Sequence, residues 1–315
     1  ANTRPVNVIS RPDQYVGITT WSGNNVDGRE IDMGMSPDLI WVKTRNQTNW
    51  NWLTDTVRGA PNKLYSNSEN AQDTSPQYGQ ADSFTDKGWI AGGGTDGSNP
   101  LSDSNQTGTN YVCWGWKAGG NKNTFNVDDV GYASAAAAGL TGTNYASLIG
   151  ASVGTKQGFS IIQYQGGGNY VTTVSHGLLQ APQFMLIKNM DDNDDWTCYH
   201  EGAGNSYYLT LNSTAARTDG TMFNDTTPTS TVFTLGAAPG SDYHNRANRS
   251  GYDYICYLWH DIPGLQKFGK YVGNNNADGP YVELGFRPAL LWVKRTDSTG
   301  SWVILDTKRS RSNPV

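Results

Sequence analysis

The chain has 315 residues, a formal net charge of −5 and only 16% charged residues. This weak negative charge argues against nucleic-acid binding, and no stretch approaches the ~20 apolar residues of a membrane-spanning helix. The glycine count of 37, with 11 tryptophans and 17 tyrosines, excludes a disordered composition. It is typical of a β protein with many turns.

The sequence predicts neither a secretory signal peptide nor a disulfide scaffold. The first 20 residues lack a basic segment followed by an apolar run, so no secretory signal peptide is predicted. Ala1 suits a native protein that has lost its initiator methionine. Three cysteines are too few for a disulfide scaffold, and we expect Cys113, Cys198 and Cys256 to be free thiols.

Residues 1–14 contain Pro5 and Pro12 and predict an extended N-terminal arm. Two interpretations remain open for it. It is either a loose terminus or an arm that adds a strand to a neighbouring subunit.

Residues 15–120 predict a first β-sandwich module. Alternation in YVGITTWSG predicts a strand, and NVDG predicts a tight turn. The short, continuously apolar DLIWVK predicts a buried strand, which pairs back with WNWLTDTV as a hairpin. SFTDKGWIAGG and NYVCWGWKAGG supply further strands.

The rest of the chain divides into three parts. Residues 121–157, rich in small residues, predict a linker or a packed inter-module segment. Residues 158–264 predict a second β-sandwich module. Residues 265–315 predict the start of a third module that stops after its first hairpin, so we expect either a longer native chain or a disordered remainder.

Repeated phrases support this division. The first phrase reads PDLIWVK at 37–43, PQFMLIK at 182–188 and PALLWVK at 288–294, and the tryptophans that follow these copies are Trp50, Trp196 and Trp302. The second reads YVCWGW at 111–116 and YICYLW at 254–259. The predicted fold class is therefore all-β, with tandem antiparallel β-sandwich modules of a jelly-roll or lectin-like kind and Gly-rich loops.

One acidic turn is the best candidate for a metal site. Asp191, Asn193 and Asp195 offer oxygen ligands at alternating spacing, as calcium loops do. The glycine and glutamate that an EF-hand needs are missing, and the matching turns of the other two copies lack this acidic run. We therefore predict a solvated hairpin turn, with no metal and no cofactor.

No catalytic motif emerges from the four histidines or from the Gly-rich turns, and His200 is predicted to be a structural residue at a strand end. Matched tryptophans, such as Trp41 and Trp292, are predicted to fill the core rather than to bind sugar. Loop aromatics without a repeated counterpart are better suited to ligand binding; these are Tyr78, Trp89, Tyr207 and Tyr243.

Long, ordered motifs also carry a resemblance to a known family. In the second half they are FSIIQYQGGGNYVTTVSHGLLQAPQFMLIK, WTCYHEGAGNSYYLTLNST, STVFTLG and KFGKYVGNNNADGPYVELGFRPALLWVKRTDSTGSWVILDTKRS, and in the first half DLIWVK, LTDTVRG, NYVCWGWKAGG and DDVGYASAAAAGLTG. Over about residues 15–315 the chain resembles tail-fibre-like structural proteins of marine tailed phages, including cyanophages. The resemblance implies a virion surface protein of lectin-like β-sandwich modules, and it transfers no catalytic residue.

Our leading hypothesis is a phage virion structural protein, a tail fibre or similar appendage that mediates host attachment by multivalent binding and is not an enzyme. It predicts a homo-oligomer in the virion, assembled in the host cytoplasm. It also predicts contacts to tail or capsid proteins through residues 1–14, and host-surface glycan as a ligand. The alternatives are a capsid decoration protein or capsid fibre, a polysaccharide depolymerase, and a carbohydrate-binding module. A depolymerase needs paired carboxylates, and Glu201 and Glu283 lack motif-like spacing.

Overall fold

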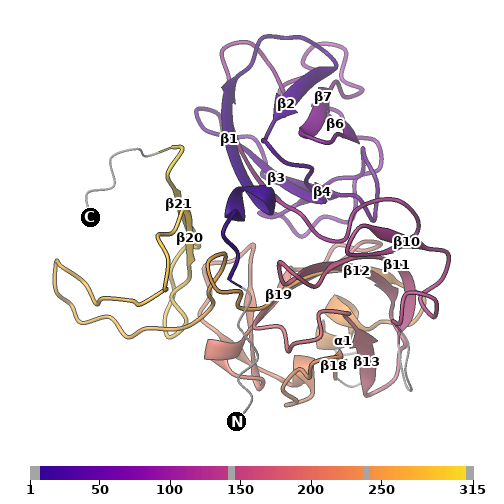
Figure 1. Cartoon of the computed structure of the whole chain (residues 1–315), viewed down its shortest axis with the longest axis vertical. Coiled ribbons are helices and arrows are strands. Elements are labelled where there is room, and N and C mark those ends of the chain that lie inside the picture. The colour runs from indigo at the N-terminus through magenta and orange to yellow at the C-terminus, as the bar shows by residue number, and fades with distance from the viewer. Residues whose placement is uncertain (1–7, 141–145, 237–241, 310–315) are drawn as a thin grey trace.

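The computed structural model describes residues 8–140, 146–236 and 242–309 (Figure 1). The protein is nearly all β, with 37% of residues in strands and 4% in helices, so the predicted all-β antiparallel sandwich class is confirmed. Among the described strands one pair departs from the antiparallel rule, because β9 (Phe125–Val127) runs parallel to β11 (Ser147–Gly154).

Module one, residues 15–120, consists of two sheets packed face to face. The larger has the order β1 (Val16–Ser22), β8 (Asn110–Trp116), β3 (Leu39–Thr44), β4 (Trp52–Asp55) and β5 (Leu64–Tyr65). The smaller has the order β2 (Arg29–Asp32), β7 (Gly88–Gly92) and β6 (Gln80–Phe84). Side chains from both sheets form one buried core, in which the ring centroids of Trp52 and Trp89 lie 5.6 Å apart.

Strand β3 shows why its sequence is apolar at every position. Ile40 and Val42 face the core of module one, while Leu39 and Trp41 face the second module. A strand covered on both faces needs apolar side chains on both.

Module two, residues 158–264, is built on a nine-stranded sheet. Its order is β10 (Val130–Tyr132), β9, β11, β12 (Phe159–Gln165), β19 (Asp253–Trp259), β14 (Phe184–Asn189), β15 (Thr197–His200), β16 (Tyr207–Thr210) and β17 (Thr218–Asp219). The segment 121–157, expected as a linker or packed inter-module segment, supplies β9, β10 and β11 to this sheet.

The opposite face of that sheet carries the second core. It is covered by a small sheet of β13 (Thr172–Ser175) and β18 (Val232–Leu235), together with helix α1 (Asp242–Ala247). Short 3-10 helices complete the described elements: η1 (Pro12–Gln14), η2 (Glu201–Ala203) and η3 (Thr221–Phe223).

Strand order and register recur along the chain. The order β1-β8-β3-β4-β5 of module one recurs as β12-β19-β14-β15-β16 in module two. Equivalent residues that pair side by side are Leu39, Trp116 and Asp55 in module one and Phe184, Trp259 and His200 in module two. In the third repeat, residues 265–309, β20 (Leu290–Val293) and β21 (Val303–Asp306) form the same hairpin, with Leu290 opposite Asp306.

The register corrects one predicted match. Thr197 takes the place of Trp52, because each lies opposite the fourth residue of the preceding strand. Trp196 and Trp302 are therefore equivalent, but Trp50 falls one residue earlier. A shift of one residue turns a side chain to the other face of a sheet. Trp50 is accordingly 45% exposed, whereas Trp196 is completely buried.

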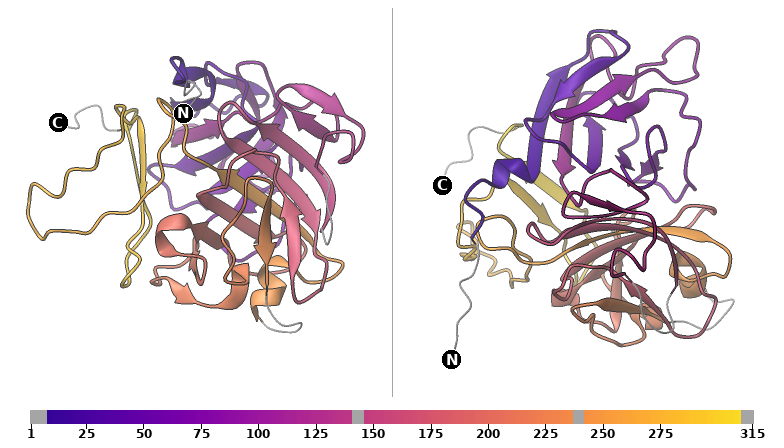
Figure 2. Two further views of the ribbon diagram at one scale, coloured as in Figure 1. Left: turned by 60° about the horizontal axis from the view of Figure 1, so that its bottom comes forward. Right: turned by 45° about the vertical axis from the view of Figure 1, so that its right-hand side comes forward.

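The two modules and the third repeat pack against one another. Figures 1 and 2 show module one in indigo and violet, module two in magenta to orange, and the yellow β20–β21 hairpin beside both. The large sheets of the two modules share a buried cluster, and Trp292, Trp302 and Ile304 of the hairpin pack against its side.

A buried polar contact joins the two modules within this cluster. Asp55 forms an ion pair with Arg58, and both side chains are almost inaccessible to solvent. Tyr257 of module two donates its hydroxyl hydrogen to Asp55 Oδ2 at 2.7 Å, and Arg58 Nη2 donates to the same hydroxyl at 3.2 Å. Burial acts to lower the pKa of Arg58, but the adjacent carboxylate outweighs it, so that the net pKa is raised.

Candidate ligand-binding groove

Four tryptophans gather where the three repeats meet. Trp41 of β3 lies 5.7 Å from Trp114 of β8 and 5.2 Å from Trp292 of β20, measured between ring centroids. Trp292 in turn lies 5.5 Å from Trp302, which precedes β21. Because equivalent strands of different repeats converge here, residues distant in sequence form one aromatic wall.

A groove of about 390 Å³ opens beside this wall. Its lining includes the four tryptophans, of which Trp41 and Trp114 are buried, exposed by only 5% and 2%. The polar part of the lining consists of amide, hydroxyl and basic groups: Lys43, Asn51, Ser66, Asn67, Asn212, Ser213, Thr214, Ser301 and Arg309. Aromatic side chains combined with a few polar groups are the usual lining of a small-molecule site.

Hydrogen bonds hold several of these polar groups in place. Trp41 Nε1 donates to Ser66 Oγ at 3.0 Å, and Lys43 Nζ donates to Asn51 Oδ1 at 2.8 Å. The backbone amide of Asn51 donates to Asn67 Oδ1 at 2.9 Å. These contacts fix the orientation of the side chains that line the groove.

One donor at the groove has no partner. Trp292 Nε1 is buried and makes no hydrogen bond among the described residues. A buried donor without an acceptor costs about 1–3 kcal/mol. This cost falls on a tryptophan that lines the groove, although its ring nitrogen is closed to solvent.

The basic groups of the groove come from two repeats. The guanidinium of Arg309 lies 5.0 Å from the ring centroid of Trp114 and pairs with Asp306. Burial, and secondly the charge of Arg309, lower the pKa of the Lys43 ammonium. Burial acts to raise the pKa of Asp306, but hydrogen bonds and charge from Arg309 outweigh it and the net pKa is lowered.

The acidic turn predicted as a solvated hairpin is tied to the rest of the molecule. Asp195 pairs with Arg246 at 2.7 Å, and Asp191 Oδ2 accepts the backbone amide of Asp253 at 2.7 Å. Asn193 Oδ1 accepts the backbone amide of Ala71, in module one, at 3.0 Å. Asn193 thus joins the two modules, while Asp191 and Asp195 make contacts within module two. The described part of the chain holds no cluster of three or more potential metal-ligating His, Cys, Asp or Glu residues.

The aromatic residues that the sequence suggested for ligand binding differ in their location and burial. Trp89 was wrongly placed in a loop, because it lies within β7 and is completely buried in the core of module one. Tyr78 is 45% exposed, and Tyr207 is partly buried beneath the guanidinium of Arg217. The side chain of Tyr243 lies outside the described residues.

The cysteines and histidines are internal groups. All three cysteines are free and buried, as predicted. His200 ends β15, and its Nδ1 accepts the backbone amide of Gly202 at 2.9 Å. Burial lowers the pKa of His176 to about 4.

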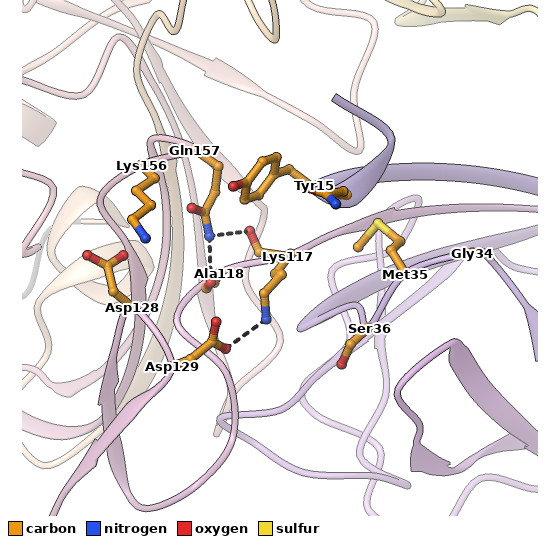
Figure 3. Close-up of a pocket in the computed structure, with 11 residues that line it drawn as sticks. Tyr15, Gly34, Met35, Ser36, Lys117, Ala118, Asp128, Asp129, Lys156 and Gln157 are labelled. Atoms are coloured by element: carbon orange, nitrogen blue, oxygen red, sulfur yellow. Dashed lines mark hydrogen bonds and ion pairs between the residues drawn. The ribbon is translucent and has the colours of Figure 1, made fainter. Parts of the chain in front are cut away.

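A second hollow, of about 310 Å³, lies between η1 and the β9–β10 turn (Figure 3). Lys117 and Asp129 form an ion pair at 2.8 Å, and Gln157 Nε2 donates to the carbonyls of Lys117 and Ala118. Figure 3 shows Lys156 pointing toward Asp128. Since these charges balance one another, the tryptophan groove is the stronger candidate.

A repeated four-residue motif in the sequence contains Arg309 of this groove. Asp-Thr-x-Arg occurs at 55–58 and again at 306–309, and each copy forms the same ion pair between its first and last residues. The groove itself has no such signal, because its walls come from repeats whose relative placement depends on packing.

The model of a family described as a domain of unknown function (DUF7483) matches residues 11–315, so the chain belongs to that family. No curated protein and no solved structure matches it. None of the helices in the described residues is long and apolar enough to cross a membrane.

Proposed function

We propose that this member of the family is a structural, adhesive subunit on the surface of a phage particle, and that its tryptophan groove binds host-surface saccharide. The phage assignment rests on the resemblance to tail-fibre-like virion proteins. The ligand class rests on one observation, the meeting of tryptophan rings with amide, hydroxyl and basic groups at the junction of the repeats.

The chemistry of the groove matches that of a sugar. Sugar rings present C–H faces that pack on aromatic rings, and hydroxyl groups that both donate and accept hydrogen bonds. The amides of Asn51 and Asn67 and the hydroxyls of Ser213 and Ser301 supply both kinds of partner. Lys43 and Arg309 favour a saccharide that carries a carboxylate or another negative group.

The fold suits display of such a site. The modules share one buried cluster and the Asp55–Arg58–Tyr257 contact, so the groove is held by a stiff framework. A pre-organised site loses little conformational entropy on binding. Many copies on one particle then convert weak individual contacts into firm attachment.

A blocking variant tests the ligand site. Ser301 is exposed at the groove, so Ser301→Trp fills the space without removing any hydrogen bond described for the groove. Thr299→Trp, at an exposed position outside the lining, is the matched control. Calorimetric titration with acidic and neutral host-surface oligosaccharides should show binding by the wild-type chain and the control, and loss of binding in Ser301→Trp. Equal binding by both variants would refute the assignment of the groove as the saccharide site.

The location of the chain requires a separate experiment. Cryo-EM of intact particles should show this chain on the particle surface with the groove facing outward. Absence of its density from the virion would end the particle assignment, even if the isolated chain bound saccharide.

A capsid decoration protein is the second candidate, and the N-terminal arm favours it. Residues 8–14 are mostly exposed, and Val8 is 64% accessible. A backbone hydrogen bond from Ile9 to the carbonyl of Pro263, at 3.0 Å, holds the arm to module two. Deleting residues 1–14 separates the candidates, because loss of head binding with tail binding intact would favour decoration.

A further inference from the structure

The hairpin of the third repeat leaves one face open. Its inner side chains, such as Trp292 and Ile304, pack on the junction of the modules. Its outer face carries Leu291, Val303 and Leu305, which are 43%, 44% and 49% exposed. The equivalent residues of module one are Ile40, Trp52 and Thr54, and all are 0–1% exposed. The third repeat therefore exposes the hairpin face that module one buries in its own core.

Contacts between repeats follow one directional pattern. Tyr257 of module two donates to Asp55 of module one, and Trp114, the equivalent of Tyr257, donates from module one to Asp306 of the third repeat at 3.2 Å. Asp306 is the equivalent of Asp55. The same kind of contact thus runs from module two to module one, and from module one to the third repeat.

A second contact repeats in the same sense. Trp196 Nε1 of module two donates to the carbonyl of Tyr65 in module one at 2.9 Å. Trp302 Nε1 of the third repeat donates to the carbonyl of Thr210 in module two, also at 2.9 Å. Tyr65 and Thr210 are equivalent, since each lies on the strand that follows the hairpin. Together the contacts describe a ring of three repeats with approximate threefold symmetry.

Modules one and two show which strand covers the edge of the hairpin in a complete repeat. In modules one and two the edge of the hairpin pairs with β8 and β19, the strands that read YVCWGW and YICYLW. Among the described residues β20 pairs only with β21. An open strand edge next to an exposed apolar face is a template for another strand.

We propose that the β20 edge is a docking site for a β-strand of the same repeat type, with the pattern Tyr-aliphatic-Cys-aromatic-x-Trp, which completes a third sandwich. The register follows from the complete modules. Leu39 and Phe184 lie opposite the final tryptophan, so Leu290 takes that tryptophan. Val42 and Ile187 lie opposite the cysteine, so Val293 takes the cysteine.

A peptide with the sequence of residues 253–261, DYICYLWHD, tests the site on the otherwise intact chain. Paired residues on antiparallel strands have Cα atoms about 4.5–5.5 Å apart, within the range of a disulfide. Val293→Cys should therefore form a disulfide with the peptide cysteine several-fold faster than Leu291→Cys, which lies two residues away. Moving the peptide cysteine by one position should abolish this advantage. The chain's own cysteines are buried.

Hydrogen exchange on the wild-type chain gives a second measurement that needs no substitution. Saturating peptide should slow exchange at the β20 amides. Equal cross-linking by the two cysteine variants, together with unchanged exchange, would overturn the proposal. So would self-association of the chain through β20 that the peptide cannot displace, because the occupant would then be a second copy.

Discussion

Tyr257→Phe probes the contact that locks the two modules together. The hydroxyl it removes donates to Asp55 Oδ2 and accepts from Arg58, in a site closed to solvent. A hydrogen bond to a charged group contributes about 1.5–3 kcal/mol, so the variant should lose that much free energy of unfolding. Asp55→Ala should lose more, about 3–5 kcal/mol, because it leaves the Arg58 guanidinium buried without its partner.

Chemical denaturation followed by tryptophan fluorescence and circular dichroism measures these losses. Tyr281→Phe is the matched control. Tyr281 is 87% exposed, and its hydroxyl donates a hydrogen bond to Glu283. The control variant should change the free energy of unfolding by less than about 0.5 kcal/mol. If Tyr257→Phe proved no more destabilising than Tyr281→Phe, the inter-module lock would be refuted.

Three further predictions follow from burial and charge. Because burial lowers the pKa of His176 to about 4, the unfolded chain binds its proton first, and stability should fall by about 3 kcal/mol as pH drops from 6.5 to 4. His176→Asn should flatten the pH slope of the unfolding free energy in that window, and an unchanged slope would contradict the assignment. Lys43→Gln should weaken binding of acidic saccharides several-fold more than binding of neutral ones in calorimetry, whereas equal weakening of both would contradict a role for the Lys43 charge. Burial raises the pKa of all three thiols, so iodoacetamide should label none of them before denaturation, as mass spectrometry can check; rapid labelling of the native chain would contradict their burial.

The repeat and the strand class could be predicted because both are local properties. DLIWVK and its copies combine β-forming residues with continuous apolar character, and this pattern survives in any sandwich that covers both faces of the strand. Trp50 shows the limit of this reasoning. Its spacing after the repeated phrase differs from that of Trp196 by one residue, and one residue decides which face it occupies.

The groove could not be predicted, because its position depends on how whole modules dock. Trp41 and Trp292 were recognised as a matched pair, but equivalence in sequence did not indicate that their rings touch. Trp89 was misplaced because the glycines that flank its segment resemble loop signals, although they lie within or beside a strand. Glycine in a strand also permits close approach of another backbone, and Gly88 lies against the carbonyl of Ile31.

A high-resolution structure of the chain bound to an acidic host-surface oligosaccharide tests the proposed groove most directly. We expect sugar density against Trp292 and Trp302, with its negative group near Lys43 or Arg309 and the three repeats packed around it. Sugar bound in the hollow beside Lys117, or at no defined place, would contradict this proposal, as would modules that pack through other faces.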